Sequence, residues 1–352
     1  MIGYLARRAR YSLFVLWGVV TVIFFLFNVL PADPARLTMG QRSDKSSIEN
    51  AAHQLNLDKP LLTRYLLYLN DLLPVSINGR DSIVRQTYHY ISLVRLTKDR
   101  ALVFKWPHLG RSYYSNRAVN AILGEALPGT ALLAIVAMSF ATVFGILLGV
   151  LAALKKNTWM DTSAIAASVA GISIPSFFAA LLIAYVFGYL LHNYTGLNMT
   201  GSLWEYDPFT GRHLALRNLI LPAFALGIRP LAIITQLSRS ALLDALSQDY
   251  IRTAYAKGLS KTKTVFRHAL PNALNPVITA VSGWLAELLA GAFFVEYIFG
   301  WKGVGKITVD ALDKYDFPLV MGAVLLTSFI FIAINLLTDI FYAWVDPRVR
   351  LY

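Results

Sequence analysis

Six long apolar segments constrain what this chain can fold into more than any other feature. Each is long enough to cross about 30 Å of hydrocarbon, which takes about 20 residues of α-helix. They lie at residues 11–30, 126–154, 163–191, 219–237, 274–299 and 319–344. The chain is 56% hydrophobic and only 15% charged, whereas soluble domains carry about 25% charged residues. The sequence therefore predicts an all-α polytopic membrane protein whose surroundings are the lipid bilayer.

The first apolar segment follows three arginines, a pattern that signal peptides share. A retained helix is favoured, because the apolar run is long and the LPADPA sequence at 30–35 is a poor cleavage site. With its N-terminus in the cytoplasm, Lys155, Lys156, residues 239–273 and the C-terminus are also cytoplasmic, in agreement with the positive-inside rule. This topology accounts for much of the net charge of +12, so we expect no nucleic-acid partner. The chain has no cysteine, so disulfides and thiolate metal sites are excluded, and we expect no metal site.

We expect three regions along the chain. An N-terminal transmembrane helix covers residues 1–30, an extracytoplasmic insertion covers 31–125, and a five-helix core covers 126–352. Within the insertion, residues 47–57 and 60–73 have helical apolar spacing. Residues 88–96 and 102–106 alternate around a turn at 97–100, which predicts a β-hairpin. The aromatic side chains of this hairpin either bind a partner or pack on the membrane domain, and packing is favoured.

The chain carries none of the enzymatic signatures HExxH, GxSxG or a cysteine nucleophile. The nearest match to a phosphate-binding loop is GWKGVGKI at 300–307, but Ile307 replaces the Ser or Thr that would hold magnesium. This segment also lies on the predicted outer side, where ATP is not available. We therefore expect no catalytic residue, and we expect its glycines to shape a turn or a short re-entrant segment.

Three charged residues, Arg229, Glu287 and Asp339, lie inside apolar segments, where charge is costly and often functional. In one interpretation they form the ion or proton path of a self-contained secondary transporter or channel, with Glu287 lining the path or pairing with Arg229. In the other they cap or cross-link helices within a bundle. The second is favoured, because no acidic or histidine relay extends over several spans. Gly145 and Gly149 form a GxxxG pair, which allows close helix packing.

The stretch 248–275, QDYIRTAYAKGLSKTKTVFRHALPNALN, is polar and basic and lies between two apolar segments. Gly258 can end a first helix, and Ser260 can cap a second, which we expect to end near Pro271. A solvated loop with snorkelling cations is the alternative, but it would need neither a cap nor an apolar stripe. A short amphipathic helix in the cytoplasm suits docking into a groove of another protein. The positions that share its apolar face are Ile251, Ala254, Tyr255, Gly258 and Leu259.

This stretch resembles the coupling loop of ABC importer permeases, whose signature is EAA, three residues, glycine, nine residues and then I-x-L-P. Arg252, Thr253 and Ala254 stand at the EAA position, and Gly258, His268, Leu270 and Pro271 follow at that spacing. Glu→Arg, Ala→Thr and Ile→His are departures. The wording DYIRTAYAKGLS and RHALPNALNPVI resembles the dipeptide/oligopeptide/nickel branch, as do LPADPA, LPGTALLAIVA (127–137), VEYIFGWKGVGKITVDALDKYDFPLV (295–320) and DPRVR (346–350). Residues 74–106 depart from that branch.

The resemblance implies the six-helix type I ABC importer permease fold, with a small extracytoplasmic α+β insertion between the first two helices. It implies a permease subunit of an ATP-driven importer in the bacterial inner membrane, with both termini cytoplasmic and di- or oligopeptides as the leading substrate. The implied partners are a homologous second permease, two cytoplasmic ATPases that bind ATP and Mg²⁺, and an extracytoplasmic solute-binding protein. This chain would hold no cofactor. The implied ATPase-coupling residues are Asp249, Tyr250, Ile251, Arg252, Thr253, Ala254, Tyr255, Ala256, Lys257, Gly258, Leu259, Ser260 and Pro271.

Overall fold

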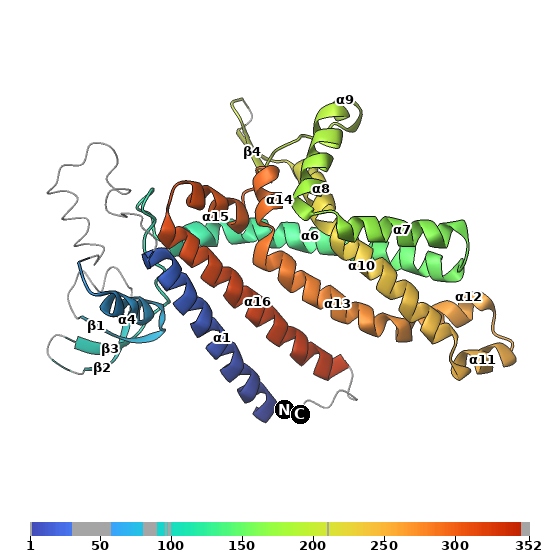
Figure 1. Cartoon of the computed structure of the whole chain (residues 1–352), viewed down its shortest axis with the longest axis horizontal. Coiled ribbons are helices and arrows are strands. Elements are labelled where there is room, and N and C mark those ends of the chain that lie inside the picture. Colours follow the sequence, from blue (N-terminus) through green and yellow to red (C-terminus); the bar gives the residue numbers. More distant parts are fainter. Residues whose placement is uncertain are drawn as a thin grey trace. The chain divides into compact units, whose positions relative to one another are not determined.

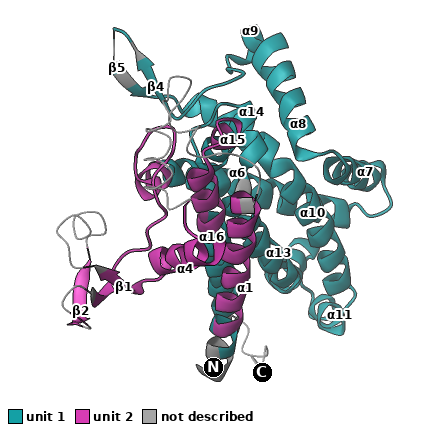
Figure 2. Ribbon diagram, turned by 60° about the vertical axis from the view of Figure 1, so that its left-hand side comes forward, with its two compact units in different colours: residues 1–9, 126–309, 327–352 teal, residues 10–125, 310–326 magenta. Residues whose placement is uncertain are grey.

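The computed structural model describes residues 2–29, 58–79, 90–95, 97, 100–209 and 211–345. Most of them are helical (Figure 1). They form two compact units, one of residues 1–9, 126–309 and 327–352 and one of residues 10–125 and 310–326 (Figure 2). The helix expected over 47–57 lies outside the described residues, as do the LPADPA and DPRVR segments.

The second unit is built around the helix α1 (Ile2–Val29) and the shorter helix α4 (Leu61–Leu72). Phe24 of α1 is buried and packs against Tyr65 of α4 with ring centroids 5.2 Å apart. The Thr21 hydroxyl lies 2.7 Å from the Tyr65 hydroxyl. The helix expected at 60–73 is therefore confirmed, with Pro60 directly before its first turn. The beginning of α16 (Phe317–Val345) contributes to the same apolar cluster.

A three-stranded antiparallel sheet follows α4, with the strand order β1–β3–β2. Its strands are β1 (Val75–Gly79), β2 (Ile91–Arg95) and β3 (Arg100–Phe104). The pairing of β2 with β3 confirms the predicted hairpin, whereas β1 was not expected. Within its unit Tyr90 is buried and Trp106 is 86% exposed, and the packing of the hairpin aromatics on the membrane domain stays a prediction.

The first unit contains most of the long apolar helices. Among the described residues, five helices are long and apolar enough to cross a membrane, or six if one bent pair counts as a span. The elements, in chain order, are α6 (Val119–Leu154), α7 (Trp159–Ser173), α8 (Ser176–Ile183), the π-helix η2 (Ala184–Leu190), α9 (His192–Thr195), β4 (Trp204–Asp207), β5 (Gly211–Leu214), the 3-10 helix η3 (Leu216–Leu219), α10 (Ile220–Leu246), α11 (Asp249–Ala256), α12 (Lys261–Thr264), the π-helix η4 (Val265–Ala269), α13 (Leu270–Gly291), α14 (Phe293–Ile298) and α15 (Val304–Asp313).

Close packing of α6 on α10 depends on the two glycines of the GxxxG pair. A Cβ at Gly145 would lie 2.8 Å from Ile234, and a Cβ at Gly149 would lie 2.6 Å from the Thr235 carbonyl oxygen. Because contacts this short are not available to a side chain, only glycine allows the two backbones to approach so closely. The packing function expected for Gly145 and Gly149 is confirmed.

The third apolar segment is not a straight helix. α7 and the continuous pair α8–η2 meet at Ile174 and Pro175 with a bend of 106°. Proline cannot donate the helical hydrogen bond and restricts the residue before it, which explains a break at this point. The apolar segment expected over 163–191 is therefore helical but is broken at Pro175.

Both arms of the bent pair nevertheless contact α10. Asp161 at the start of α7 makes a bidentate ion pair with Arg239 near the end of α10, at 2.5 and 2.7 Å. Beyond the bent pair, Asn198 donates to Asn218, just before α10, at 3.2 Å. Residues 218 and 239 are about 30 Å apart along a helix, which is the thickness of the hydrocarbon. The two contacts therefore join the chain on the two sides of the bend to opposite ends of α10.

Candidate functional site

The predicted helix, glycine turn and capped second helix are present after α10. α11 runs from Asp249 to Ala256, and the chain reverses at Gly258, whose φ is +80°. Glycine is favoured there because an L side chain is strained in the left-handed region. The Ser260 hydroxyl then accepts from the backbone N–H of Lys263 at 3.5 Å and caps α12. The local signals in the sequence were sufficient for this part of the site.

The second helix does not end near Pro271, contrary to the prediction. α12, η4 and α13 form one continuous helix from Lys261 to Ala290. Pro271 lies in the first turn of α13, where proline is tolerated. The π-turn just before it, in which Leu270 N–H donates to the Val265 carbonyl five residues back, widens the helix at the place where a proline ring would clash.

The apolar stripe predicted for α11 is only partly buried, because Ile251 and Ala254 face inward whereas Tyr255 and Gly258 are exposed. The prediction is therefore wrong for Tyr255 and Gly258. Ile251 is 1% exposed and Ala254 is 7% exposed. Ile251 belongs to a cluster formed by the ends of α6, α10 and the η4–α13 helix. These two residues therefore anchor α11 to its own chain and are not free to dock on a partner. The other buried members of the cluster are Val150, Ala153, Leu242, Ala245, Ala269 and Ala273.

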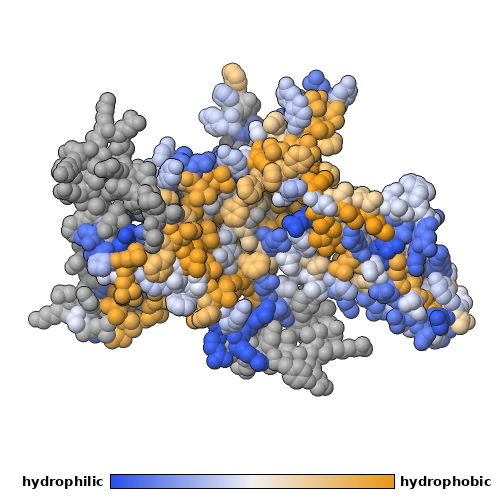
Figure 3. Space-filling view, in the orientation of Figure 1, coloured by the Kyte–Doolittle hydropathy of each residue, from blue (hydrophilic) through white to orange (hydrophobic). Residues whose placement is uncertain are grey.

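The surface that α11 presents to solvent consists of its polar and aromatic positions. Tyr255 is 43% exposed, and Thr253 and Ala256 are exposed beside it. The Arg252 side chain is 80% exposed and reaches Asp249 at 3.4 Å. An ion pair this exposed contributes little to stability, so Arg252 remains available to other molecules. Hydrophilic residues gather over the α11–α12 end of the unit (Figure 3).

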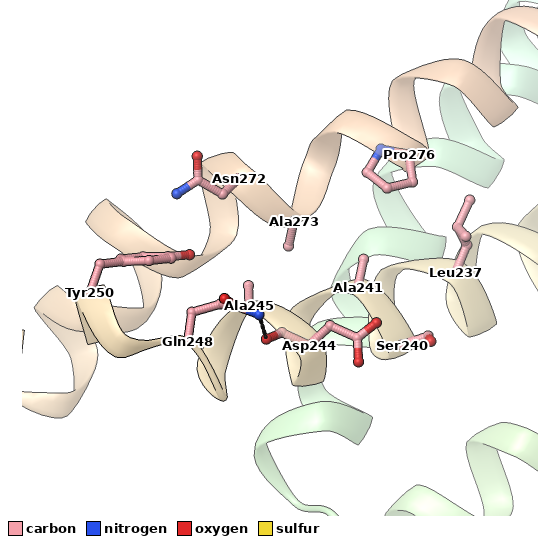
Figure 4. Close-up of a pocket in the computed structure, with 10 residues that line it drawn as sticks. All are labelled: Leu237, Ser240, Ala241, Asp244, Ala245, Gln248, Tyr250, Asn272, Ala273 and Pro276. Atoms are coloured by element: carbon pink, nitrogen blue, oxygen red, sulfur yellow. Dashed lines mark hydrogen bonds between the residues drawn. The ribbon is translucent and has the colours of Figure 1, made fainter. Parts of the chain in front are cut away.

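A cavity of about 440 Å³ lies between α10 and α13 beside α11. Figure 4 shows its two walls, with Ser240 and Asp244 on α10 and with Asn272 and Pro276 on α13. Gln248 donates from its side-chain amide to the Asp244 carbonyl at 3.4 Å and forms part of the end near α11. The cavity was not predicted, because its walls come from helices 30 residues apart in sequence.

The three charged residues inside apolar segments have different surroundings. Asp339 forms an ion pair with Arg8 at 2.5 Å, which ties α16 to α1. Arg229 is exposed, and its guanidinium carbon lies 5.5 Å from the centre of the Trp284 ring. Glu287 is exposed, and among the described residues it has no hydrogen bond or ion pair. The structure thus shows the cross-link expected of Asp339 but no pair between Arg229 and Glu287.

The glycine-rich segment 300–307 binds a carboxylate of its own chain. Glu296 is fully buried, and it accepts from the Thr130 hydroxyl at 2.7 Å and from Lys306 N–H at 3.1 Å. A Cβ at Gly303 would lie 2.4 Å from the Glu296 carboxylate. The place where a phosphate would bind is therefore occupied by Glu296. The segment forms a turn into α15, as expected of its glycines.

Two family models match this chain. The model described as binding-protein-dependent transport system inner membrane component matches residues 145–351. Its N-terminal counterpart matches residues 1–82. Together the two matches extend over both the α10–α13 core and the first helix.

Named relatives match over almost the entire chain. The di/tripeptide transport system permease protein DppB of Pseudomonas aeruginosa is 35% identical, with 99% of each chain covered. The dipeptide transport system permease protein DppB of Alkalihalophilus pseudofirmus is 30% identical over 99% of this chain and all of the relative. The glutathione transport system permease protein GsiC of Escherichia coli is 33% identical over 99% of each. A solved chain of the inward-facing MetNI methionine ABC transporter has a TM-score of 0.45 at 18% identity, covering 62% of this chain and 96% of that one.

Proposed function

Because this chain belongs to the binding-protein-dependent transport system inner membrane components, as an ABC importer permease of the peptide family, we propose that it forms half of the translocation pathway of an ATP-driven importer of di- and oligopeptides. The relatives are named for dipeptide, di/tripeptide and glutathione transport, which supports this substrate class. A homologous second permease would complete the pathway, and an extracytoplasmic solute-binding protein would deliver the peptide.

α11 would be the element that docks on a cytoplasmic ATPase. The observation that carries this proposal is the division of α11 into two faces. Its inner face, with Ile251 and Ala254, is fixed to the ends of α6, α10 and the η4–α13 helix. Its outer face, with Arg252 and Tyr255, is exposed. A helix that is anchored on one side and exposed on the other can transmit a displacement from a bound partner to the helices behind it.

The direction of transmission follows from covalent continuity. α11 connects through Gly258 to the helix that begins at Lys261 and runs without a break to Ala290. ATP and Mg²⁺ would bind to the ATPases and not to this chain. Nucleotide changes the conformation of the permease only if it binds one state of the complex more tightly than the other. The docking face of α11 would transmit the conformational change of the ATPases to the membrane helices. In this topology both termini would be cytoplasmic.

The test replaces an exposed tyrosine on each side of the membrane. Tyr255→Glu places a charge on the docking face without disturbing the anchor. Tyr194→Glu makes the same change in α9, where the tyrosine is 89% exposed and where the proposed topology is extracytoplasmic. We expect Tyr255→Glu to abolish co-purification of the ATPases from membranes, with normal amounts of permease, while Tyr194→Glu leaves co-purification intact. Normal ATPase association of the Tyr255→Glu variant would refute the docking assignment.

The rival function, a self-contained secondary transporter that uses Arg229, Glu287 and Asp339, is not favoured. One of its three groups, Asp339, is already paired with Arg8. The rival requires gradient-driven transport in liposomes that contain this chain alone, whereas the importer reading requires ATP and the partner subunits.

A further inference from the structure

A stripe of mainly polar positions runs along the exposed face of α13 within its membrane-crossing length. The positions recur every three or four residues, so they share one face of the helix. All five of them are exposed. Polar and charged groups are expensive against lipid, so this face must be covered by protein or by water in the membrane. Its members are Asn272, Asn275, Thr279, Gly283 and Glu287.

A second polar stripe lies on α10 and borders the same surface. Arg229, Ser240 and Asp244 are exposed, and Gln236 is half-buried among them. The two helices are antiparallel and in register at both ends. Arg229 lies over Trp284 of α13 at one end, and at the other end the 440 Å³ cavity brings α10 residues opposite α13 residues. The stripes therefore form one polar face that extends for about 22 Å along the helices.

Two opposite charges lie together at the end of this face away from α11. Glu287 is three residues beyond Trp284 and so is its neighbour on the helix surface. The Arg229 guanidinium lies 5.5 Å from the centre of the Trp284 ring, so Arg229 and Glu287 border the same part of α13, about one helical turn apart along its axis. Among the described residues neither charge has a hydrogen bond or an ion pair. The five guanidinium donors and the two carboxylate oxygens are therefore free to bind a ligand.

We propose that this face lines the aqueous path and that the two charges bind the ends of a zwitterionic peptide. Arg229 binds the peptide carboxylate and Glu287 binds the peptide ammonium group. The proposal rests on the proposed function of a peptide importer, and it adds the residues that hold the cargo. The end charges of an extended dipeptide are about 7 Å apart, so one peptide can reach two groups that lie about one helical turn apart. A site that binds only the two ends makes no contact with the peptide side chains, so it accepts peptides of many sequences.

The surroundings of the pair favour a ligand over a protein contact. No atom lies within 4 Å of a Cβ built on Gly283, so there is open space one turn before Glu287. At the opposite end the same face widens into the cavity beside Asp244. A second permease packed directly on this face would bury both charges, and burial of charge is costly unless each one is paired.

The natural absence of cysteine makes a direct test possible. Gly283→Cys places a thiol in the open space beside the pair. Gly18→Cys is the matched control, because it also has no atom within 4 Å of its Cβ but lies in the apolar helix α1. Both variants are prepared in membranes with the complete transporter and treated with a charged methanethiosulfonate reagent. Since the thiolate is the reactive form and is not formed in lipid, we expect Gly283→Cys to react at least about tenfold faster than Gly18→Cys.

Protection by peptide then tests the two charges. Without binding protein present, alanyl-alanine is expected to slow labelling of Gly283→Cys several-fold. N-acetylated alanyl-alanine, which lacks the ammonium group, is expected to give little protection. Adding Glu287→Gln to the reporter variant is expected to abolish protection by alanyl-alanine.

Each outcome decides one part of the proposal. Labelling of Gly283→Cys as slow as that of Gly18→Cys would show that protein or lipid covers this face. Fast labelling without protection by alanyl-alanine would leave an aqueous path but overturn the peptide site. Thr279→Cys serves as a second reporter if the Gly283→Cys complex does not assemble. Failure of the proposed function is detected separately, because the ATPases would then not co-purify with the unmodified chain.

Discussion

Replacing Ile251 with alanine would test whether α11 depends on its inward anchor. α11 has eight residues, and isolated helices shorter than about 12 residues are marginal in water. Its stability must therefore come from packing, and Ile251 is its largest buried side chain at 1% exposure. Truncating a buried isoleucine to alanine costs about 2–5 kcal/mol. A central loss of about 3 kcal/mol would increase the population of detached α11 roughly 150-fold.

Trypsin measures this population directly. Arg252 and Lys257 are trypsin sites on α11 and at its end, and cleavage of a folded helix follows the fraction that opens. We expect Ile251→Ala to increase the cleavage rate by about two orders of magnitude in inside-out vesicles without ATPases. Tyr255→Ala is the control, because it removes an exposed side chain from the same helix and is expected to leave the rate unchanged. A less than about threefold effect of Ile251→Ala would show that α11 is held by something other than this cluster.

Two further predictions concern buried groups elsewhere. Gly303→Ala places a Cβ 2.4 Å from the Glu296 carboxylate and is expected to cost about 3 kcal/mol through overpacking and lost hydrogen bonds. The control Gly124→Ala has nothing within 4 Å of its Cβ and is expected to be neutral or stabilising. Thermal denaturation in detergent compares the two variants, and equal melting temperatures would contradict the close packing of Gly303 on the Glu296 carboxylate. Asp71→Asn removes one charged partner, at 3.5 Å, of the buried Lys105 ammonium and is expected to cost about 2 kcal/mol. Burial lowers the pKa of Lys105, and the Asp71 carboxylate raises it. Without Asp71 the pKa of Lys105 in the folded chain falls further, so at alkaline pH the unfolded variant binds more protons than the folded variant and its stability rises with pH. The stability deficit of Asp71→Asn should therefore shrink as pH rises toward 10, and a deficit that does not change with pH would refute this reasoning.

Local signals in the sequence were enough for elements whose causes are local. Gly258 and Ser260 mark the turn and the cap by their own backbone and side-chain preferences. The β2–β3 hairpin followed from alternation on both sides of a short turn. β1 was missed because it has only five residues and pairs with β3, which lies more than 20 residues further along the chain. The β4–β5 hairpin was not predicted, because each of its strands has only four residues.

The arrangement of the candidate site depended on contacts that a single helix does not encode. Helical spacing correctly placed Ile251 and Ala254 on one face of α11, but it could not show that α10 and α13 cover that face. The same limitation applied to Arg229 and Glu287, because the rotation of each helix is set by packing. Pro271 was taken as a helix end, since the compensating π-turn before it is a response of the backbone that has no clear residue signature.

The bend between α7 and α8 also determines how the protein responds to the thickness of its bilayer. Straight helices adjust to a thicker or thinner membrane by tilting. α10 has little freedom to tilt, because Gly145 and Gly149 hold it against α6 at backbone contact. The bent pair has a joint at Pro175 between two arms of about 22 Å each, so a change of its angle changes the distance between its two ends. We therefore expect a change in bilayer thickness to alter the angle between α7 and α8 before it alters the packing of α6 on α10.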